Sequence, residues 1–189
     1  SFPTRRSSDL KLKVSWKVVP AATSYQIYRS TAKDGDYQNI KTINSVGTSS
    51  WTDGSVKTGK TYYYKIKTVV KTQNGEQTSG FSNVKSAKAV PAKTTLKAKA
   101  SDAKNVKLTW SKVKGASGYE IYRSNSKDGK CSKVKTISKG STTSYKNGKL
   151  KKSTTYYYKI RAYRKVNGKK VYGSYSSVVS VDRKSTRLN

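Results

Sequence analysis

The sequence predicts an all-β protein made of two tandem antiparallel β-sandwiches, and three observations lead to this prediction. The six letters TYYYKI occur at 61–66 and again at 155–160, which indicates two copies of one domain. Apolar and polar residues alternate along short segments, as in strands with one face in water. Turn residues return about every 8–12 residues, and no stretch keeps the helical period of about 3.6 residues over about ten positions.

The two copies align without a gap from Trp16 to Ile66 when the chain is shifted by 94 positions, so that Trp16 meets Trp110. Beyond the tyrosine run, Asn74-Gly75 matches Asn167-Gly168 only at a shift of 93. We therefore expect one domain type to occur twice, with one residue missing from the second copy near its last hairpin.

In the second copy each expected strand is a short run of apolar residues that alternate with polar ones. Two turns interrupt these runs: Lys127-Asp128-Gly129, whose glycine tolerates positive φ, and the tight Asn167-Gly168 hairpin. The expected strands are Val106–Trp110, Tyr119–Arg123, Cys131–Ile137, a short one at Tyr145, the tyrosine run and a last one ending near Val181.

The first copy repeats this order but begins at its second strand. Residues 94–103 provide a first strand for the second copy, and its counterpart is missing before Lys11. We expect the first copy to lack its N-terminal strand, to expose an unpaired strand edge and to be the less stable half.

Strand parity divides the tyrosine run between two faces. In the second copy Tyr156 and Tyr158 point one way, while Tyr157, Lys159 and Arg161 point the other way. The first set is predicted to be buried, because the second set bears the charges. The residues expected in the two cores are Trp16, Tyr62, Tyr64, Trp110, Tyr156 and Tyr158.

These residues resemble the fibronectin type III family. Trp110 lies on an early strand, and Leu150 precedes Tyr156 by six residues, which is similar to the buried tryptophan and the tyrosine corner of that family. The resemblance implies two immunoglobulin-like sandwiches, and it implies that the Tyr156 hydroxyl turns back to the backbone of the preceding loop. The usual proline of that loop is replaced by Thr58 and by Lys152. More narrowly, the chain is similar to the Lys/Tyr-rich versions found in secreted proteins of Gram-positive bacteria.

Both ends of the chain resemble translated short-read sequencing adapters. The first string is SFPTRRSSDL at 1–10 and the second is DRKSTRLN at 182–189. We therefore expect a fragment of a longer gene, with one fibronectin type III-like repeat at 11–90 and another at 91–181. The junction between them is very short, which predicts a semi-rigid rod. This fragment contains no apparent transmembrane segment.

The sequence offers little material for catalysis. It contains no His, one cysteine at Cys131 and nine acidic residues that are thinly spread, so it predicts no catalytic residues, no metal site and no cofactor. Asp34 and Asp36 are close enough in sequence to chelate a cation, but the surrounding lysines oppose this. We expect a protein that is not an enzyme.

Charge is the unusual feature of the composition. Lys and Arg total 41 and Asp and Glu total 9, for a net charge of +32. Such a field attracts polyanions, including wall polymers, acidic glycans and nucleic acid. Most of the basic residues are lysines, whereas readers of nucleic acid usually depend on arginine forks, so no specific nucleic-acid partner is expected. The alternative interpretation is a solvated coat that serves solubility.

Exposed tyrosines beside basic residues are the candidate ligand-facing groups. Parity places Tyr157 near Tyr122 and Tyr63 near Tyr28, on the outer face of the sheet. One interpretation is an aromatic platform for sugar rings or for a protein partner. The other is a cross-strand pair that stabilises the sheet by roughly 0.2–1 kcal/mol and shelters lysine stems. The candidates are Tyr28, Tyr63, Tyr122, Tyr157, Lys65, Lys159 and Arg161.

The resemblance implies a non-catalytic spacer or adhesive stalk in an extracellular, cell-wall-associated bacterial protein, which presents other domains away from the surface. One alternative is direct binding of anionic wall polymer or carbohydrate through exposed Lys and Tyr. Another is an accessory module of a glycan-degrading enzyme.

Overall fold

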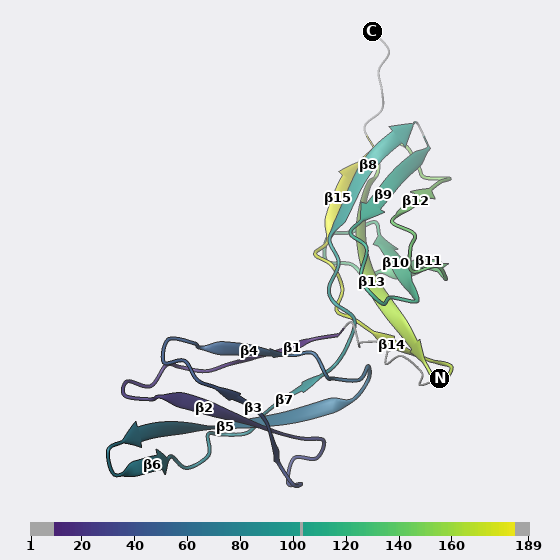
Figure 1. The fold of residues 1–189 in the computed structure, drawn as a ribbon. Coiled ribbons are helices and arrows are strands. Elements are labelled where there is room, and N and C mark those ends of the chain that lie inside the picture. Colours follow the sequence, from purple (N-terminus) through teal and green to yellow (C-terminus); the bar gives the residue numbers. More distant parts are fainter. Residues whose placement is uncertain (1–9, 103, 184–189) are drawn as a thin grey trace. The chain divides into compact units, whose positions relative to one another are not determined.

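The computed structural model describes residues 10–102 and 104–183, and all regular elements among them are strands (Figure 1). The chain divides into two compact units, residues 1–89 and 90–189. Each unit pairs its strands into antiparallel sheets, so the predicted all-β class with two sandwiches is confirmed. The described part of the chain contains no helix that is long and apolar enough to cross a membrane.

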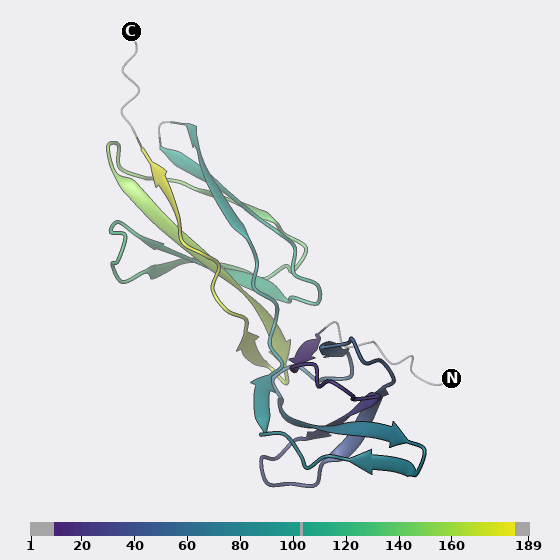
Figure 2. The same cartoon turned by 90° about the vertical axis from the view of Figure 1, so that its left-hand side faces the viewer.

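Unit 2 contains eight described strands in two sheets (Figure 2). The smaller sheet has the order β12-β9-β8, and the larger has the order β11-β10-β13-β14, with β15 paired to the start of β13. The two sheets together form an antiparallel β-sandwich of the immunoglobulin-like class. The strands are β8 (Leu96–Asp102), β9 (Asn105–Trp110), β10 (Gly118–Ser124), β11 (Ser132–Ile137), β12 (Ser144–Asn147), β13 (Thr155–Val166), β14 (Lys169–Tyr172) and β15 (Val179–Asp182).

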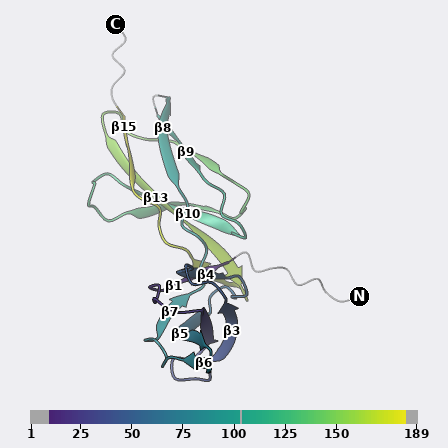
Figure 3. The same ribbon diagram turned by 60° about the vertical axis from the view of Figure 1, so that its left-hand side comes forward.

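Unit 1 repeats this arrangement without a counterpart of β8 among its described residues (Figure 3). Its smaller sheet is therefore only β1 paired with β4, while the larger has the order β3-β2-β5-β6, with β7 on β5. Residues 1–9, which align with β8 at the shift of 94, lie outside the described residues, so the expected loss of the N-terminal strand stays a prediction. The strands are β1 (Leu12–Ser15), β2 (Ser24–Ser30), β3 (Gln38–Ile43), β4 (Ser50–Asp53), β5 (Thr61–Thr72), β6 (Gly75–Thr78) and β7 (Lys85–Lys88).

The core of unit 2 lies between its two sheets and is built on the parity of β13. Tyr156, Tyr158 and Ile160 point inward and are almost fully buried. Trp110 of β9 packs across from them and lies 5.4 Å from the Tyr119 ring. Four of the thirteen buried residues of this core cluster are large rings, which adds core volume in a chain that is only 33% hydrophobic.

The core of unit 1 is smaller and is open on one side. Tyr62 and Tyr64 are buried as their counterparts are, but Trp16 is only partly buried. The difference has a direct cause: in unit 2 the edge of β9 is covered by β8, whereas the described residues give β1 no strand on that edge. We expected Trp16 in the core, and the structure leaves it at the border.

The tyrosine corner forms in both units without its usual proline. The backbone N–H of Lys57 donates to the Tyr62 hydroxyl oxygen at 2.9 Å, and that of Lys151 donates to Tyr156 at 3.0 Å. The loop turns through Gly59, with φ 83°, in unit 1, and through Ser153, with φ 50°, in unit 2. Residues in the left-handed region therefore make the bend where proline is absent.

The last hairpins explain why the Asn-Gly pairs of the two copies match at a shift of 93 instead of 94. In unit 2 the central turn residues are Asn167-Gly168, with φ 48° and 75°, as a type I′ turn requires. In unit 1 they are Gln73-Asn74, and Gly75 opens the next strand with φ 115°. The strands on both sides keep the shift of 94. The prediction of a residue missing from the second copy is therefore wrong. The Asn-Gly pair is displaced by one position at the turn, while the strand pairing is the same in both units.

The folded part is slightly longer than residues 11–181. Leu10 is buried in unit 1, and Asp182 pairs with Thr155 in β15. The Arg183 side chain is buried in unit 2, where its Nη1 donates to the carbonyls of Asp102 at 2.7 Å and Asn105 at 2.6 Å. The rest of the two expected tails, residues 1–9 and 184–189, lies outside the described residues.

We expect unit 1 to unfold before unit 2 on heating. Among the described residues the core cluster contains six buried residues in unit 1 and thirteen in unit 2, so unit 1 gains less from apolar burial. Calorimetry should show two transitions, and hydrogen exchange should release the amides of β2 and β5 before those of β10 and β13. A single transition, or earlier exchange in unit 2, would contradict this expectation.

Candidate binding face of the larger sheet

The outward side chains of β10 and β13 form the candidate site of unit 2. The two strands pair so that Glu120 stands opposite Arg161 and Tyr122 stands opposite Lys159. Glu120 and Tyr122 share one face because they are two residues apart on a strand. The register therefore brings an acid, two cations and a tyrosine together on the outside of the sheet.

Glu120 is the centre of this face, and its side chain is only 1% exposed. Its Oε2 accepts hydrogen bonds from the Tyr122 hydroxyl at 2.8 Å and from Arg161 Nη2 at 2.9 Å. Its Oε1 accepts from Lys170 Nζ at 3.0 Å and from the Tyr172 hydroxyl at 3.1 Å. Both carboxylate oxygens are thus engaged by donors of the same unit, which is how a buried charge is tolerated.

The electrostatics of this cluster fix its protonation. Burial alone raises the pKa of Glu120, but hydrogen bonds from Arg161, Lys170 and two tyrosines outweigh it and lower the pKa to about 2. Burial and the neighbouring Tyr175 and Glu120 raise the pKa of Tyr122 above its ordinary value. Glu120 is therefore a carboxylate and Tyr122 a neutral donor at physiological pH.

Arg161 is held among three aromatic rings. Its guanidinium carbon lies 3.6 Å from the centroid of Tyr172, 4.9 Å from that of Tyr175 and 5.4 Å from that of Tyr122. Lys159 Nζ lies 4.5 Å from the Tyr175 centroid. These are cation–π distances, so the cations cover the ring faces of this sheet.

The equivalent face of unit 1 keeps the stacking but not the acid. Lys65 Nζ lies 3.8 Å from the Phe81 centroid and 4.1 Å from that of Tyr37. Gln26 takes the place of Glu120 and accepts a hydrogen bond from the Tyr28 hydroxyl at 3.0 Å. The charged network is therefore a property of unit 2.

The four outward tyrosines that we expected to be exposed are partly buried, and the structure gives them neighbours other than those we expected. Tyr157 stands opposite Ser124, and the ring beside Tyr122 is Tyr175, edge-on at 5.2 Å. The cause is the strand register, which puts Lys159 and not Tyr157 directly across from Tyr122. Unit 1 repeats this, with Tyr63 opposite Ser30, Lys65 opposite Tyr28, and Phe81 edge-on to Tyr28 at 5.0 Å.

Sequence reasoning missed several members of this face. Glu120 was detectable, because it shares the parity of Tyr122 on an expected strand. Tyr172 and Tyr175 were not, since they follow the last hairpin, where no alternating pattern shows which way a side chain points. Phe81 in unit 1 was missed for the same reason.

A second polar cluster, inside unit 1, was also missed. Asp53 is fully buried, and its Oδ2 accepts from Arg29 Nη1 at 2.6 Å and from the Tyr64 hydroxyl at 2.8 Å. Burial raises the pKa of Asp53, but hydrogen bonds from Ser55 and Arg29 bring it below the ordinary value. In unit 2 Asn147 holds the same place and accepts from Tyr158 at 2.8 Å. This cluster ties the core to a loop and is closed to ligands.

Within residues 10–102 and 104–183, no group of three or more His, Cys, Asp or Glu side chains is placed to hold a metal ion. Cys131 is a free, partly buried thiol on the approach to β11.

Comparison with known proteins gives partial likenesses. No protein-family model matches the chain. Over 63 residues, or 33% of this chain, it is 41% identical to an amylopullulanase of Thermoanaerobacter thermohydrosulfuricus, and the match spans 4% of that protein's length. A crystal structure of the chicken CNTN1 FN1–FN3 domains shares 18% identity at a TM-score of 0.45, over 93% of this chain and 63% of that one.

We expect Glu120→Gln to destabilise unit 2 by about 3 kcal/mol, because it leaves Arg161 and Lys170 close together without a carboxylate between them. Urea denaturation followed by near-UV circular dichroism measures the loss. Asp128→Asn, which removes an exposed acid from a turn of the same unit, is the control and should be nearly neutral. Equal stability of the two variants would show that the network contributes little.

The effect of Glu120 should also depend on pH in a defined direction. Its pKa is about 2 in the folded unit against an ordinary value of 4.5. A lowered folded-state pKa adds stability above the unfolded value, and this part is lost as the pH falls from about 5 toward 2. The difference between wild type and Glu120→Gln should therefore shrink across that range. Denaturation curves at about pH 7, 5 and 3 test it, and a constant difference would refute it.

Proposed function

We propose that the chain is a non-catalytic spacer or adhesive stalk of an extracellular, cell-wall-associated bacterial protein, with repeats at 11–90 and 91–181. In this role the folded units hold other domains away from a surface and act mechanically. The observation that best supports it is that the polar groups on the outer face of the larger sheet of unit 2 already form hydrogen bonds and ion pairs with one another.

A face built to bind a ligand keeps donors, acceptors or ring faces available. Glu120 already accepts hydrogen bonds from four side chains at its two oxygens, and Arg161 lies over three rings. A ligand would have to displace these contacts and leave a buried carboxylate unpaired, which costs several kcal/mol. The face is therefore better suited to hold its own sheet together than to exchange partners.

The strand pairing suits a mechanical role. β13 is hydrogen-bonded to β10, to β14 and to β15, so the long central strand joins most of its sheet. β5 does the same in unit 1 through β2, β6 and β7. Force applied to a unit is then shared by several ladders of backbone hydrogen bonds.

Two observations favour other functions. The net charge of +32 favours diffuse attachment to anionic wall polymers through exposed lysines. The partial match to an amylopullulanase favours an accessory module of a glycan-degrading enzyme. Both alternatives require direct contact with a polymer, whereas the spacer does not.

Binding to purified cell wall as a function of salt separates these functions. For a spacer we expect no saturable binding at about 20 mM salt and none at about 200 mM. Saturable binding that falls steeply with salt, and that disappears when anionic polymers are extracted from the wall, would replace the spacer with the polymer-binding function. Retardation in a native gel that contains pullulan would favour the accessory-module function. The control is a lysine-rich unfolded peptide of similar charge, which reports non-specific attraction.

A further inference from the structure

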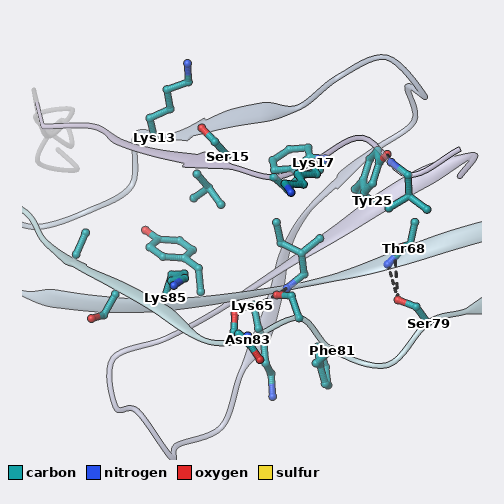
Figure 4. A pocket seen from close by; sticks show the side chains of 18 of the residues that line it. Lys13, Ser15, Lys17, Tyr25, Lys65, Thr68, Ser79, Phe81, Asn83 and Lys85 are labelled. Atoms are coloured by element: carbon teal, nitrogen blue, oxygen red, sulfur yellow. Dashed lines mark hydrogen bonds between the residues drawn. The ribbon is translucent and has the colours of Figure 1, made fainter.

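The outer face of the larger sheet of unit 1 carries two partly exposed lysines over one phenylalanine ring. Lys65 and Lys67 are two residues apart on β5, so they share a face and stand about 7 Å apart. Their Nζ atoms lie 3.8 Å and 4.3 Å from the Phe81 centroid. Figure 4 shows Lys65 and Phe81 on the side of the sheet away from Lys13 of β1. Neither lysine forms an ion pair with a described acid.

Phe81 is held over this face by the segment that follows β6. The backbone N–H of Thr68 donates to Ser79 Oγ at 2.9 Å, a hydrogen bond drawn in Figure 4. The backbone N–H of Ile66 donates to Ser82 Oγ at 3.0 Å. Phe81 lies between these two ties to β5 and is 44% exposed. The ring and the two ammonium groups therefore form a preorganised surface that is open to a partner.

Unit 2 fills the equivalent place with an acid of its own. At the shift of 94, Lys67 corresponds to Arg161 and Gln26 corresponds to Glu120. Glu120 accepts a hydrogen bond from Arg161 Nη2 at 2.9 Å. In unit 1, Lys67 stands opposite the neutral Gln26. Unit 2 therefore shows that a cation at this position of the sheet pairs with a glutamate side chain, and unit 1 has the cation without the glutamate.

We propose that this face of unit 1 binds an acidic segment of a partner protein through Lys65 and Lys67. The segment would be extended and would carry carboxylates at alternate positions, because side chains two apart on a strand have the same spacing of about 7 Å as the two lysines. The partner would supply the carboxylate that Glu120 supplies within unit 2. This inference goes beyond the spacer role, which needs no partner at this face.

The surroundings of the lysines favour a protein segment over an anionic polymer. Cations already lie against the Phe81 ring, so a sugar has little free ring face on which to stack. Acids flank the lysines, with Glu76 toward one end of the face, on β6, and Asp34 near Tyr37 toward the other. A polymer charged at every unit would meet these acids, whereas a segment with two carboxylates would meet only the lysines.

The chain itself offers one pair of acids at alternate positions. These are Asp34 and Asp36, which are exposed and belong to the turn before β3. The net charge of +32 opposes the close approach of a second copy that would bring them. Residues 1–9 contain a single acid and therefore lack the pair. A partner of opposite charge is the favoured occupant.

Titration of peptides into the full chain, followed by NMR, tests the proposal. The probe GTETETG has glutamates at alternate positions, and GTQTQTG is its uncharged control. At about 20 mM salt the probe should shift the signals of the β5 amides and the Phe81 ring to saturation, and the control should not. GEETTTG has the same charge, but its adjacent glutamates point to opposite faces of an extended segment. It should bind about threefold more weakly.

A double substitution locates the site on the protein. Lys65→Gln with Lys67→Gln should weaken binding of GTETETG about tenfold, because two charge pairs are lost. Lys99→Gln with Lys107→Gln is the charge-matched control. It removes two exposed lysines that stand opposite each other in the smaller sheet of unit 2, and it should change binding less than about twofold. Circular dichroism checks that both variants are folded.

Gln26→Glu gives unit 1 the acid that unit 2 has. The new carboxylate stands opposite Lys67, so it should pair with this lysine and weaken binding of GTETETG about fivefold. Gln77→Glu makes the same chemical change on the opposite face of the β5–β6 pair, where Gln77 stands opposite Val70. It should leave binding nearly unchanged. This comparison keeps the proposal testable even where the double substitution disturbs folding.

Several results would overturn the proposal. Equal binding of GTETETG and GEETTTG, or equal weakening by the two double substitutions, would show that net charge alone attracts the peptide. Unchanged binding in Gln26→Glu would place the peptide away from Lys67. Binding of an anionic wall polymer that is lost in the Lys65 and Lys67 double substitution, without any response to the peptide, would assign the face to the polymer. A dimer of the chain that Asp36→Asn dissociates would identify a second copy as the occupant.

Discussion

The fold depends on the alternation of inward and outward side chains along the long central strand of each unit. On β13 the inward residues Tyr156 and Tyr158 fill the core, while the outward Lys159 and Arg161 cover the sheet. Both sets need the same backbone register, since a slip of one residue would exchange the two faces. Because β13 also pairs with three other strands, this register fixes most of the larger sheet.

The same register explains how a strongly basic chain folds. Charges that would repel one another across a lysine-rich surface are placed over aromatic rings, as with Lys65 on Phe81 and Arg161 on Tyr172. Glu120 adds a local neutralising charge in unit 2 and is buried by the groups that it neutralises. The tyrosines thus serve twice, since alternate rings supply core volume and surface for cations.

Much of this was predictable from the sequence, for physical reasons. Period-two alternation identified the strands and the inward rings Tyr62, Tyr64, Tyr156 and Tyr158, because burial of one face imposes it. The outer face was less predictable, because its partners come from β14 and the loop beyond it, where Tyr172 and Tyr175 follow no period. The one-residue offset at Asn74 led to the wrong prediction of a deletion. An Asn-Gly pair can shift by one position within a hairpin turn while the pairing of the two strands stays the same.

The exposed last strand of unit 1 has a consequence for the lifetime of the protein. A chain so rich in lysine offers many cleavage points to trypsin-like proteases, and strands paired inside a sandwich withhold them. Every residue of β7 is exposed, from Lys85 to Lys88, and β7 is held on one side by β5. We expect the first cut in β7. This cut requires β7 to detach from β5, and it leaves unit 2 intact. Degradation of the tandem would then proceed from one unit to the next.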